Sequence, residues 1–294
     1  MKKTGMILFI LLLMLSLSTG CSNQENSITE SNNTTDNNLE QISNKASQSD
    51  ADMFTDRDYR TAYDENESIL IHLNGDSATA SSNSVKISGS TVQITEEATY
   101  IISGTLNNGI ILVDAEDTAK LQIVLNGVSI TNESSAALYI LSADKVFVTL
   151  AEGTENTLAN GGSFIAIDEN NIDAVVFSKQ DLTFNGTGNL IITSPNGNGI
   201  VGKDDLVFTG GNYTINTSSH GIEANDSVRI TGTTQITVDA GKDGIHCENN
   251  DDTSLGFIYI SAGTLNIEAE GDGISASAYM QIVDGTFSVL AGGG

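Results

Sequence analysis

The chain has no tryptophan, and only 12 of its 294 residues are lysine or arginine, against 38 aspartates and glutamates. The absence of tryptophan excludes a neutral-sugar site built on stacked indole rings. The net charge of −26 excludes nucleic acid as a partner, because phosphate contacts need a basic surface. Acidity of this size also keeps an exported protein soluble.

Two cysteines and three histidines limit the metal chemistry open to the chain. Cys21 falls at the end of an N-terminal targeting segment, which leaves Cys247 as the remaining thiol. His72, His220 and His246 do not follow a ligand spacing, so no zinc-type site is predicted. No nucleophile elbow, phosphate loop or nucleotide fingerprint is found in the sequence.

The N-terminal apolar run Met6–Leu15 is shorter than the ~20 residues that cross a membrane as a helix. Two lysines precede it and Ser18-Thr19-Gly20-Cys21 follows, an order typical of a bacterial lipoprotein signal over residues 1–21. Cleavage would leave Cys21 as the acylated N-terminus. Ser18 stands where Leu is usual, and a plain secretory signal is the alternative. An extracellular protein, lipid-anchored to the membrane at the cell surface, is predicted.

Composition divides the remaining chain into a tether and a body. Residues 22–52 are rich in Ser, Asn, Gln, Thr and Glu, with scarcely any large apolar side chain, and are predicted to be a disordered polar tether. The body, residues 53–294, is long enough for a single core. Because a further repeat would be due near the end of the sequence, the body is expected to be truncated at its C-terminus.

A short motif built on Gly-Ile occurs four times in the second half of the body, and successive copies are 22, 23 and 29 residues apart. The copies are Gly199-Ile200, Gly221-Ile222, Gly244-Ile245 and Gly273-Ile274. A small residue stands two places after each Ile: Gly202, Ala224, Cys247 or Ala276. Two apolar pairs complete each unit. In the first copy they are Leu206/Phe208 and Tyr213/Ile215, and in the last copy they are Met280/Ile282 and Phe287/Val289. The longer steps fit one residue added at Gly232–Gln235 and six added around Glu248–Leu255.

Short period-2 strands in a unit of this length, with no helical stretch, predict one coil of a parallel β-solenoid. A coil cannot bury its apolar face alone, so coils must stack and equivalent positions form ladders. The irregular units favour an all-β, right-handed, single-stranded parallel β-helix. Leucine-rich repeats are excluded by the missing Leu and Asn spacing, and a β-sandwich is the alternative. Cys247 lies in the small-residue ladder and is predicted to pack in the interior.

Acidic residues gather at the predicted turns between strands rather than spreading evenly. Stacked carboxylates repel one another unless a cation lies between them, and hard oxygen ligands suit Ca²⁺. A solvated acidic rim without metal is the alternative. The predicted calcium ligands are Asp204, Asp205, Asp226, Asp243, Glu248, Asn249, Asp251, Asp252 and Asp272.

Lys179 and Lys203 occupy the same place in successive coils, beside carboxylates, in a chain poor in lysine. A lysine near bound calcium can act as the base that removes the C5 proton of a uronide in β-elimination. The simpler interpretation is that both lysines neutralise neighbouring aspartates. The aromatic candidates for stacking on a sugar are Tyr213, Tyr259 and Tyr279.

Several segments carry a resemblance to a known family: Met53–Asp58, Asp144–Leu158, Phe177–Lys179, Gly202–Leu206 and Asp243–His246. Over nearly all of the body the chain is similar to secreted bacterial carbohydrate-binding β-helix proteins, which share their fold with pectate lyases. The resemblance implies a right-handed parallel β-helix that holds calcium and binds plant cell-wall polysaccharides, such as pectic polyuronates or cellulose. Gln180 departs from the family pattern, because it stands where a second acid is usual.

The predicted function is therefore calcium-dependent extracellular binding of plant cell-wall polysaccharide, with calcium joining acidic sugars to an acidic surface. One alternative is a calcium-dependent polysaccharide lyase with Lys203 or Lys179 as its base. A second alternative is a structural or adhesive surface protein without a glycan site. The glycan, the number of calcium ions and the oligomeric state do not follow from the sequence.

Overall fold

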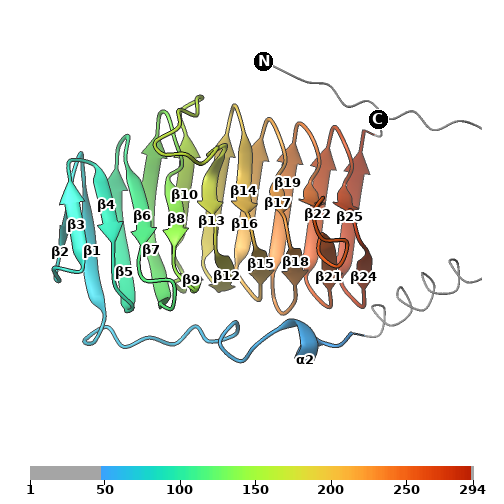
Figure 1. The fold of residues 1–294 in the computed structure, drawn as a ribbon, viewed down its shortest axis with the longest axis horizontal. Helices are drawn as coiled ribbons and strands as arrows, with labels where there is room; N and C mark the ends of the chain where they lie inside the picture. Colours follow the sequence, from blue (N-terminus) through green and yellow to red (C-terminus); the bar gives the residue numbers. More distant parts are fainter. Residues whose placement is uncertain (1–47, 293–294) are drawn as a thin grey trace, which may run out of the picture. The chain divides into compact units, whose positions relative to one another are not determined.

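The computed structural model describes residues 48–292. They form two sheets, of 16 and nine strands, and one short helix, α2 (Asp50–Met53). Figure 1 shows the strands following one another in stacked coils from β1 to β25. The prediction of an all-β fold with parallel, stacked coils is confirmed. The targeting segment and the tether up to residue 47 lie outside the described residues.

The nine-stranded sheet receives one strand from each coil, in the order β23-β20-β17-β14-β11-β8-β6-β4-β3. All its pairs are parallel except β3 with β4 at one end. Its strands are β3 (Val85–Ser88), β4 (Thr91–Ile94), β6 (Ile110–Asp114), β8 (Leu138–Ser142), β11 (Ala174–Ser178), β14 (Asn198–Gly202), β17 (Ile222–Ala224), β20 (Ile245–Cys247) and β23 (Ile274–Ala276).

The 16-stranded sheet has two arms that meet at the long strand β7 (Lys120–Asn132). The first half of β7 pairs with β9 and the second half with β10, so each later coil contributes one strand to each arm. The first arm holds β9 (Lys145–Leu150), β12 (Asp181–Gly186), β15 (Asp205–Phe208), β18 (Ser227–Ile230), β21 (Phe257–Ile260) and β24 (Met280–Ile282). The second arm holds β10 (Glu155–Asn160), β13 (Asn189–Ser194), β16 (Asn212–Thr217), β19 (Gln235–Ala240), β22 (Thr264–Ala269) and β25 (Thr286–Ala291).

At the N-terminal end of the stack, β5 (Thr99–Leu106) pairs in parallel with both β7 and β1 (Ile69–Gly75). The short strand β2 (Ala78–Ala80) pairs antiparallel with β1. Among residues 48–292, no helix has the length and apolar character needed to span a bilayer.

The predicted register of the coils is confirmed at each repeated position. Ile200, Ile222, Ile245 and Ile274 are paired in turn along the nine-stranded sheet, and the small residues ending at Cys247 and Ala276 form their own row. Ile222, Ile245 and Cys247 are completely buried. Burying each isoleucine side chain contributes about 1.5–3 kcal/mol. The six added residues form the loop between β20 and β21, outside the ladders.

The glycine before each repeated isoleucine allows close approach of neighbouring coils. A Cβ atom on Gly221 would lie 2.6 Å from the carbonyl oxygen of Gly244 and 2.5 Å from a methyl group of Val238. A Cβ on Gly244 would meet the carbonyl oxygen of Gly273 at 2.6 Å. A side chain at these positions would force the backbone ladder apart, so glycine is required for packing between coils.

Residues 48–63, here termed the strap, run along the outer side of the first arm (Figure 1). The Tyr259 hydroxyl donates to Asp50 Oδ1 at 2.9 Å, and the Gln281 side-chain amide donates to the carbonyl oxygen of Gln48 at 2.9 Å. At the other end of the strap, Tyr63 packs near the buried Ile101. Residues 48–52, which the sequence analysis assigns to the tether, therefore already contact the sheet.

Asp58 fastens the middle of the strap and is only 1% exposed. Its carboxylate accepts a hydrogen bond from Thr183 Oγ1 at 2.6 Å and lies 3.0 Å from the Lys145 ammonium. Burial alone raises the pKa of Asp58, but the Thr183 hydrogen bond and the Lys145 charge together lower it below its ordinary value. The carboxylate is thus held ionised against the sheet.

Removing an inward ladder residue should destabilise the stack far more than removing an exposed isoleucine. We expect Ile222→Ala to lower the free energy of unfolding by about 2–5 kcal/mol, because it leaves a cavity in the core. Ile165 is 62% exposed, so Ile165→Ala should change it by less than about 0.5 kcal/mol. Urea unfolding followed by circular dichroism measures both values. Equal losses would contradict the assignment of Ile222 to the core.

Candidate functional site

The outer face of the nine-stranded sheet changes from covered to open along the stack. The loop of residues 161–173 covers β8, β11 and β14, where Ile172 and Phe164 pack against Tyr139, Phe177 and Val201. Beyond this loop, at β17 and β20, the outward side chains are polar and partly exposed. β17 and β20 therefore offer an open polar surface for a ligand on this sheet.

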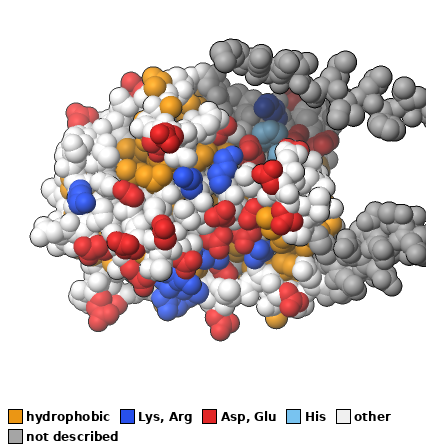
Figure 2. All heavy atoms as spheres, viewed as in Figure 1, with side chains coloured by type: hydrophobic (Ala, Val, Ile, Leu, Met, Phe, Trp, Pro, Cys, Tyr) orange, Lys and Arg blue, Asp and Glu red, His pale blue; other side chains and the backbone are white. Residues whose placement is uncertain are grey.

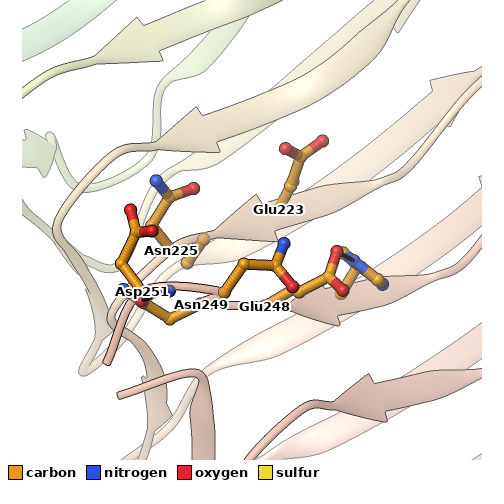
Figure 3. Close-up of a pocket in the computed structure, with 8 residues that line it drawn as sticks. Glu223, Asn225, Glu248, Asn249 and Asp251 are labelled. Atoms are coloured by element: carbon orange, nitrogen blue, oxygen red, sulfur yellow. Dashed lines mark hydrogen bonds and ion pairs between the residues drawn. The ribbon is translucent and has the colours of Figure 1, made fainter. Parts of the chain in front are cut away.

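A polar pocket of about 280 Å³ opens at this place (Figure 3). Its lining residues are Glu223, Ala224, Asn225, His246, Glu248, Asn249, Asn250 and Asp251. The six-residue insertion between β20 and β21 supplies half of this wall. Since Ala224 is its only apolar lining residue, the pocket suits a hydroxylated or charged ligand better than an apolar one.

Asn249 organises the loop that forms the wall. Its side-chain oxygen accepts the backbone N–H groups of Asp251 at 3.0 Å and Asp252 at 2.8 Å, and its own backbone N–H donates to Ser277 Oγ at 3.1 Å. Its side-chain nitrogen donates to Asp226 Oδ1 at 3.1 Å. This last bond connects the pocket to a group of carboxylates at the next turn.

Those carboxylates, here termed the acidic column, are Asp181, Asp204, Asp205 and Asp226. They lie where successive coils pass from the nine-stranded sheet to the first arm. Burial, followed by the charges of Asp181 and Asp226, raises the pKa of Asp204 to about 6. Burial and the charge of Asp205 likewise raise the pKa of Asp226. The column thus retains unrelieved repulsion between stacked carboxylates.

Two members of the acidic column already have a cation, since Lys145 Nζ lies 4.0 Å from Asp181 Oδ2 and Arg229 pairs with Asp205. Arg229 Nη2 lies 2.6 Å from Asp205 Oδ2, and Ser227 Oγ donates to Asp205 Oδ1 at 2.5 Å. Figure 2 shows acidic side chains outnumbering basic ones over the face in view. Asp204 and Asp226 are therefore the members of the column best placed to receive a further positive charge.

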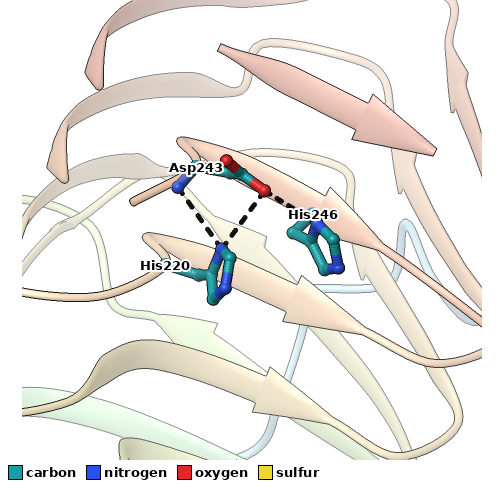
Figure 4. Close-up of side chains that lie close together, drawn as sticks. All are labelled: His220, Asp243 and His246. Carbon is teal, nitrogen blue, oxygen red and sulfur yellow. Dashed lines mark hydrogen bonds and ion pairs between the residues drawn. The ribbon is translucent and has the colours of Figure 1, made fainter. Parts of the chain in front are cut away.

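His220, Asp243 and His246, here termed the histidine cluster, come together beside the pocket (Figure 4). Asp243 Oδ2 lies 2.8 Å from His246 Nδ1 and 3.5 Å from His220 Nδ1. The spacing along the chain does not indicate this group, because His220 and His246 meet across two neighbouring coils. The sequence did indicate that His220 and Asp243 are neighbours. Both stand just before a Gly-Ile motif, and stacking of the coils places such equivalent positions next to each other.

The nine predicted calcium ligands do not meet at one point. Asp204, Asp205 and Asp226 belong to the acidic column, and Glu248, Asn249 and Asp251 line the pocket. Asp243 belongs to the histidine cluster, while Asp252 and Asp272 are exposed. Within residues 48–292, the histidine cluster is the one group of three His, Cys, Asp or Glu side chains whose ligand atoms lie within 4.8 Å of one another.

The two predicted lysines do occupy equivalent positions, since Ser178 and Gly202, which precede them, are paired. Lys203 Nζ lies 3.8 Å from Glu223 Oε1 and 5.7 Å from the centre of the Phe177 ring. Lys179 lies within electrostatic reach of Asp168 in the loop 161–173. Both lysines therefore neutralise carboxylates, and Lys203 does so at the edge of the pocket.

The three tyrosines proposed as sugar platforms are not available for stacking. Tyr213 is 2% exposed and its hydroxyl donates to the carbonyl oxygen of Gly210 at 2.7 Å inside the core. Tyr259 is 1% exposed because the strap covers it. Tyr279 is half-buried, stacks on Phe257 at 4.9 Å and donates its hydroxyl to Gln48. The aromatic part of the predicted site is therefore wrong.

Known proteins support a family assignment. A family model described as carbohydrate-binding domain-containing protein matches residues 88–294. A protein of the same description from Acetivibrio thermocellus is 36% identical over 211 residues, which make up 71% of this chain and 73% of the relative. A solved structure, the gadolinium derivative of a polysaccharide lyase-like protein from C. thermocellum, is 36% identical and has a TM-score of 0.74, covering 77% of this chain and 92% of that one. The chain belongs to the family of carbohydrate-binding domain-containing proteins.

Proposed function

We propose that this chain binds an acidic plant cell-wall polysaccharide, such as a pectic polyuronate, outside the cell and with the help of calcium. The observation that carries the proposal is the polar pocket at β17 and β20 in a member of a carbohydrate-binding family. Its amide, imidazole and carboxylate groups offer donors and acceptors for sugar hydroxyls. Cellulose is the second ligand in this proposal, since it presents the same hydroxyl groups without charge.

Charge is the reason for including calcium. Glu223, Glu248 and Asp251 line the pocket, and Lys203 pairs with Glu223 alone. A polyuronate would be repelled by these carboxylates unless a divalent cation joined the two negative partners. Asp204 and Asp226 are the residues we assign to calcium, with the nearby Asn249 amide. Their ligand atoms do not yet converge, so binding would draw them together.

We further propose that the coils close into a right-handed β-helix and that Cys21, outside the described residues, carries the lipid that places the protein at the cell surface. The strap would then begin where the tether ends.

A polysaccharide lyase is the second candidate function. Two observations favour it: the similar structure is described as polysaccharide lyase-like, and Lys203 stands at the edge of the pocket, 3.8 Å from Glu223. In such a reaction, Lys203 would take the C5 proton of a uronide while the bond to the leaving sugar oxygen breaks, leaving a C4–C5 double bond.

Asp204 should make stability depend on pH in a direction opposite to that of a salt-bridged aspartate. Its pKa of about 6 exceeds its ordinary value of 3.8, so its contribution to stability is present below about pH 4 and is lost as the pH rises through 6. We expect Asp204→Asn to raise the free energy of unfolding by about 1–2 kcal/mol at pH 8 and to leave it unchanged at pH 4. Urea unfolding in chelator at the two pH values measures this.

Calcium should act on the same carboxylate. At pH 8 we expect calcium to stabilise the native protein and to have little effect on Asp204→Asn. Asp239→Asn is the control, because Asp239 is exposed on β19 of the second arm. A calcium effect of equal size in all three proteins would contradict the assignment of Asp204 to the cation.

Pocket substitutions should weaken glycan binding without changing the fold. We expect Glu223→Gln and Asp251→Asn each to reduce calcium-dependent affinity for oligogalacturonate about tenfold, because each replaces a charged acceptor for the sugar hydroxyls with a weaker, neutral one. Isothermal titration calorimetry with calcium and with chelator measures the affinity, and Asp239→Asn again serves as control. Full affinity in both pocket variants would show that the glycan binds elsewhere, and no binding by the native protein would refute the proposal.

The lyase candidate predicts a different observable. Incubation with polygalacturonate and calcium would generate ultraviolet absorbance from the unsaturated product, and Lys203→Ala would abolish it. Absorbance that stays flat in the native protein, together with measurable affinity, supports binding without cleavage. Steady growth that depends on Lys203 would make the chain an enzyme.

A further inference from the structure

The histidine cluster joins residues from two neighbouring coils. His220 precedes β17, whereas Asp243 and His246 stand on either side of the start of β20. The two imidazole rings lie face to face, with centroids 4.7 Å apart and planes inclined by 30°. The three side chains are 15%, 16% and 22% exposed for His220, Asp243 and His246, so the group is partly shielded yet reachable.

Two imidazole nitrogens and one carboxylate oxygen form a donor set for a borderline divalent metal ion. Calcium prefers a cage made of oxygen atoms alone, whereas zinc and its neighbours take imidazole readily. All three ligand atoms already lie within 4.8 Å of one another, so small rotations of the side chains suffice to bring them to bonding distance. Three protein ligands leave further coordination positions for water or another oxygen ligand.

Outer contacts orient these ligands in the way that metal sites require. Glu248 Oε2 lies 3.5 Å from His246 Nε2, the nitrogen that faces away from Asp243. When a metal ion occupies Nδ1, a carboxylate at this place accepts the proton on Nε2 and orients the ring. Asp243 Oδ1 accepts the backbone N–H of Asp272 at 2.8 Å, which leaves Oδ2 directed at the histidines.

His220 presents an unprotonated nitrogen to the cluster. Its Nδ1 accepts the backbone N–H of Asp243 at 3.3 Å, and a metal ion would take the place of this long hydrogen bond. Cys247 is not a further ligand, because its side chain is completely buried and burial raises the pKa of its thiol to about 12.

We propose that His220, Asp243 and His246 bind a divalent metal ion of the zinc class at the edge of the polar pocket. The site is separate from the acidic column assigned to calcium and does not depend on a glycan. In the metal-free protein, His246 Nδ1 and Asp243 Oδ2 are hydrogen-bonded at 2.8 Å, and the incoming ion takes the place of that hydrogen bond.

Metal titration of the full chain tests the site without any sugar. After treatment with chelator and its removal, Co²⁺ is titrated while the visible d–d absorbance is followed, and Zn²⁺ is then added to displace it. We expect a visible band that saturates at one ion per chain and disappears with zinc. Saturating zinc should also raise Tm by about 5 °C.

Matched variants locate the ion. We expect His220→Gln and His246→Gln each to weaken zinc binding by about 100-fold or more, and Glu248→Gln to weaken it about tenfold through His246. His72→Gln is the control, since His72 lies on β1 at the far end of the stack and should bind zinc like the native protein. Circular dichroism in chelator confirms that the variants fold.

Three results would overturn the proposal. The first is the absence of both the cobalt band and the zinc-dependent rise in Tm in the native protein, which would leave the cluster as a hydrogen-bonded triad. The second is native-like zinc affinity in a folded variant that combines His220→Gln with His246→Gln. Displacement of cobalt by an equal concentration of calcium would also contradict it, because it would place the ion among the carboxylates.

Discussion

Backbone hydrogen bonding between successive coils is the constraint from which the other features of this molecule follow. In a parallel ladder each residue lies beside its equivalent in the next coil. Each side chain must therefore be compatible with the equivalent side chains of the two neighbouring coils. The interior accepts such repetition readily, as the row from Ile200 to Ile274 illustrates. Gly221 and Gly244 keep the ladder closed by giving the neighbouring carbonyl oxygens room.

The same repetition has a different effect at the turns, where the side chains carry charge. Aspartates that share a turn position are brought near one another, and burial together with these neighbouring charges raises the pKa of Asp204. Arg229 and Lys145 relieve part of this repulsion by contacting Asp205 and Asp181. Where the stacked groups differ, as at His220 and Asp243, the ladder instead builds a mixed set of ligands. Candidate binding sites in this fold therefore form where equivalent positions of successive coils carry different side chains.

The predictability of each feature depends on whether its cause is local to the repeat. The register could be predicted because Ile200, Ile222 and Ile245 recur with their neighbours, and the inserted loop was visible as a longer step. The burial of Tyr259 could not be predicted in this way, because it depends on the strap, in which Asp50 lies 209 residues away in sequence. The histidine cluster was missed because ligand spacing was sought along the chain, whereas its members meet across the stack.

The strap has a mechanical consequence. A stack of coils in which each touches only its neighbours would ordinarily open from an end, one coil at a time. Here Gln48 is hydrogen-bonded to Gln281 on β24, and Tyr63 packs beside β5, so a single segment is fastened to coils at both ends of the ladder. A pulling force applied to the strap from its N-terminal side therefore acts first on the last strands of the chain. The contacts of the strap then distribute this force over the coils along the stack.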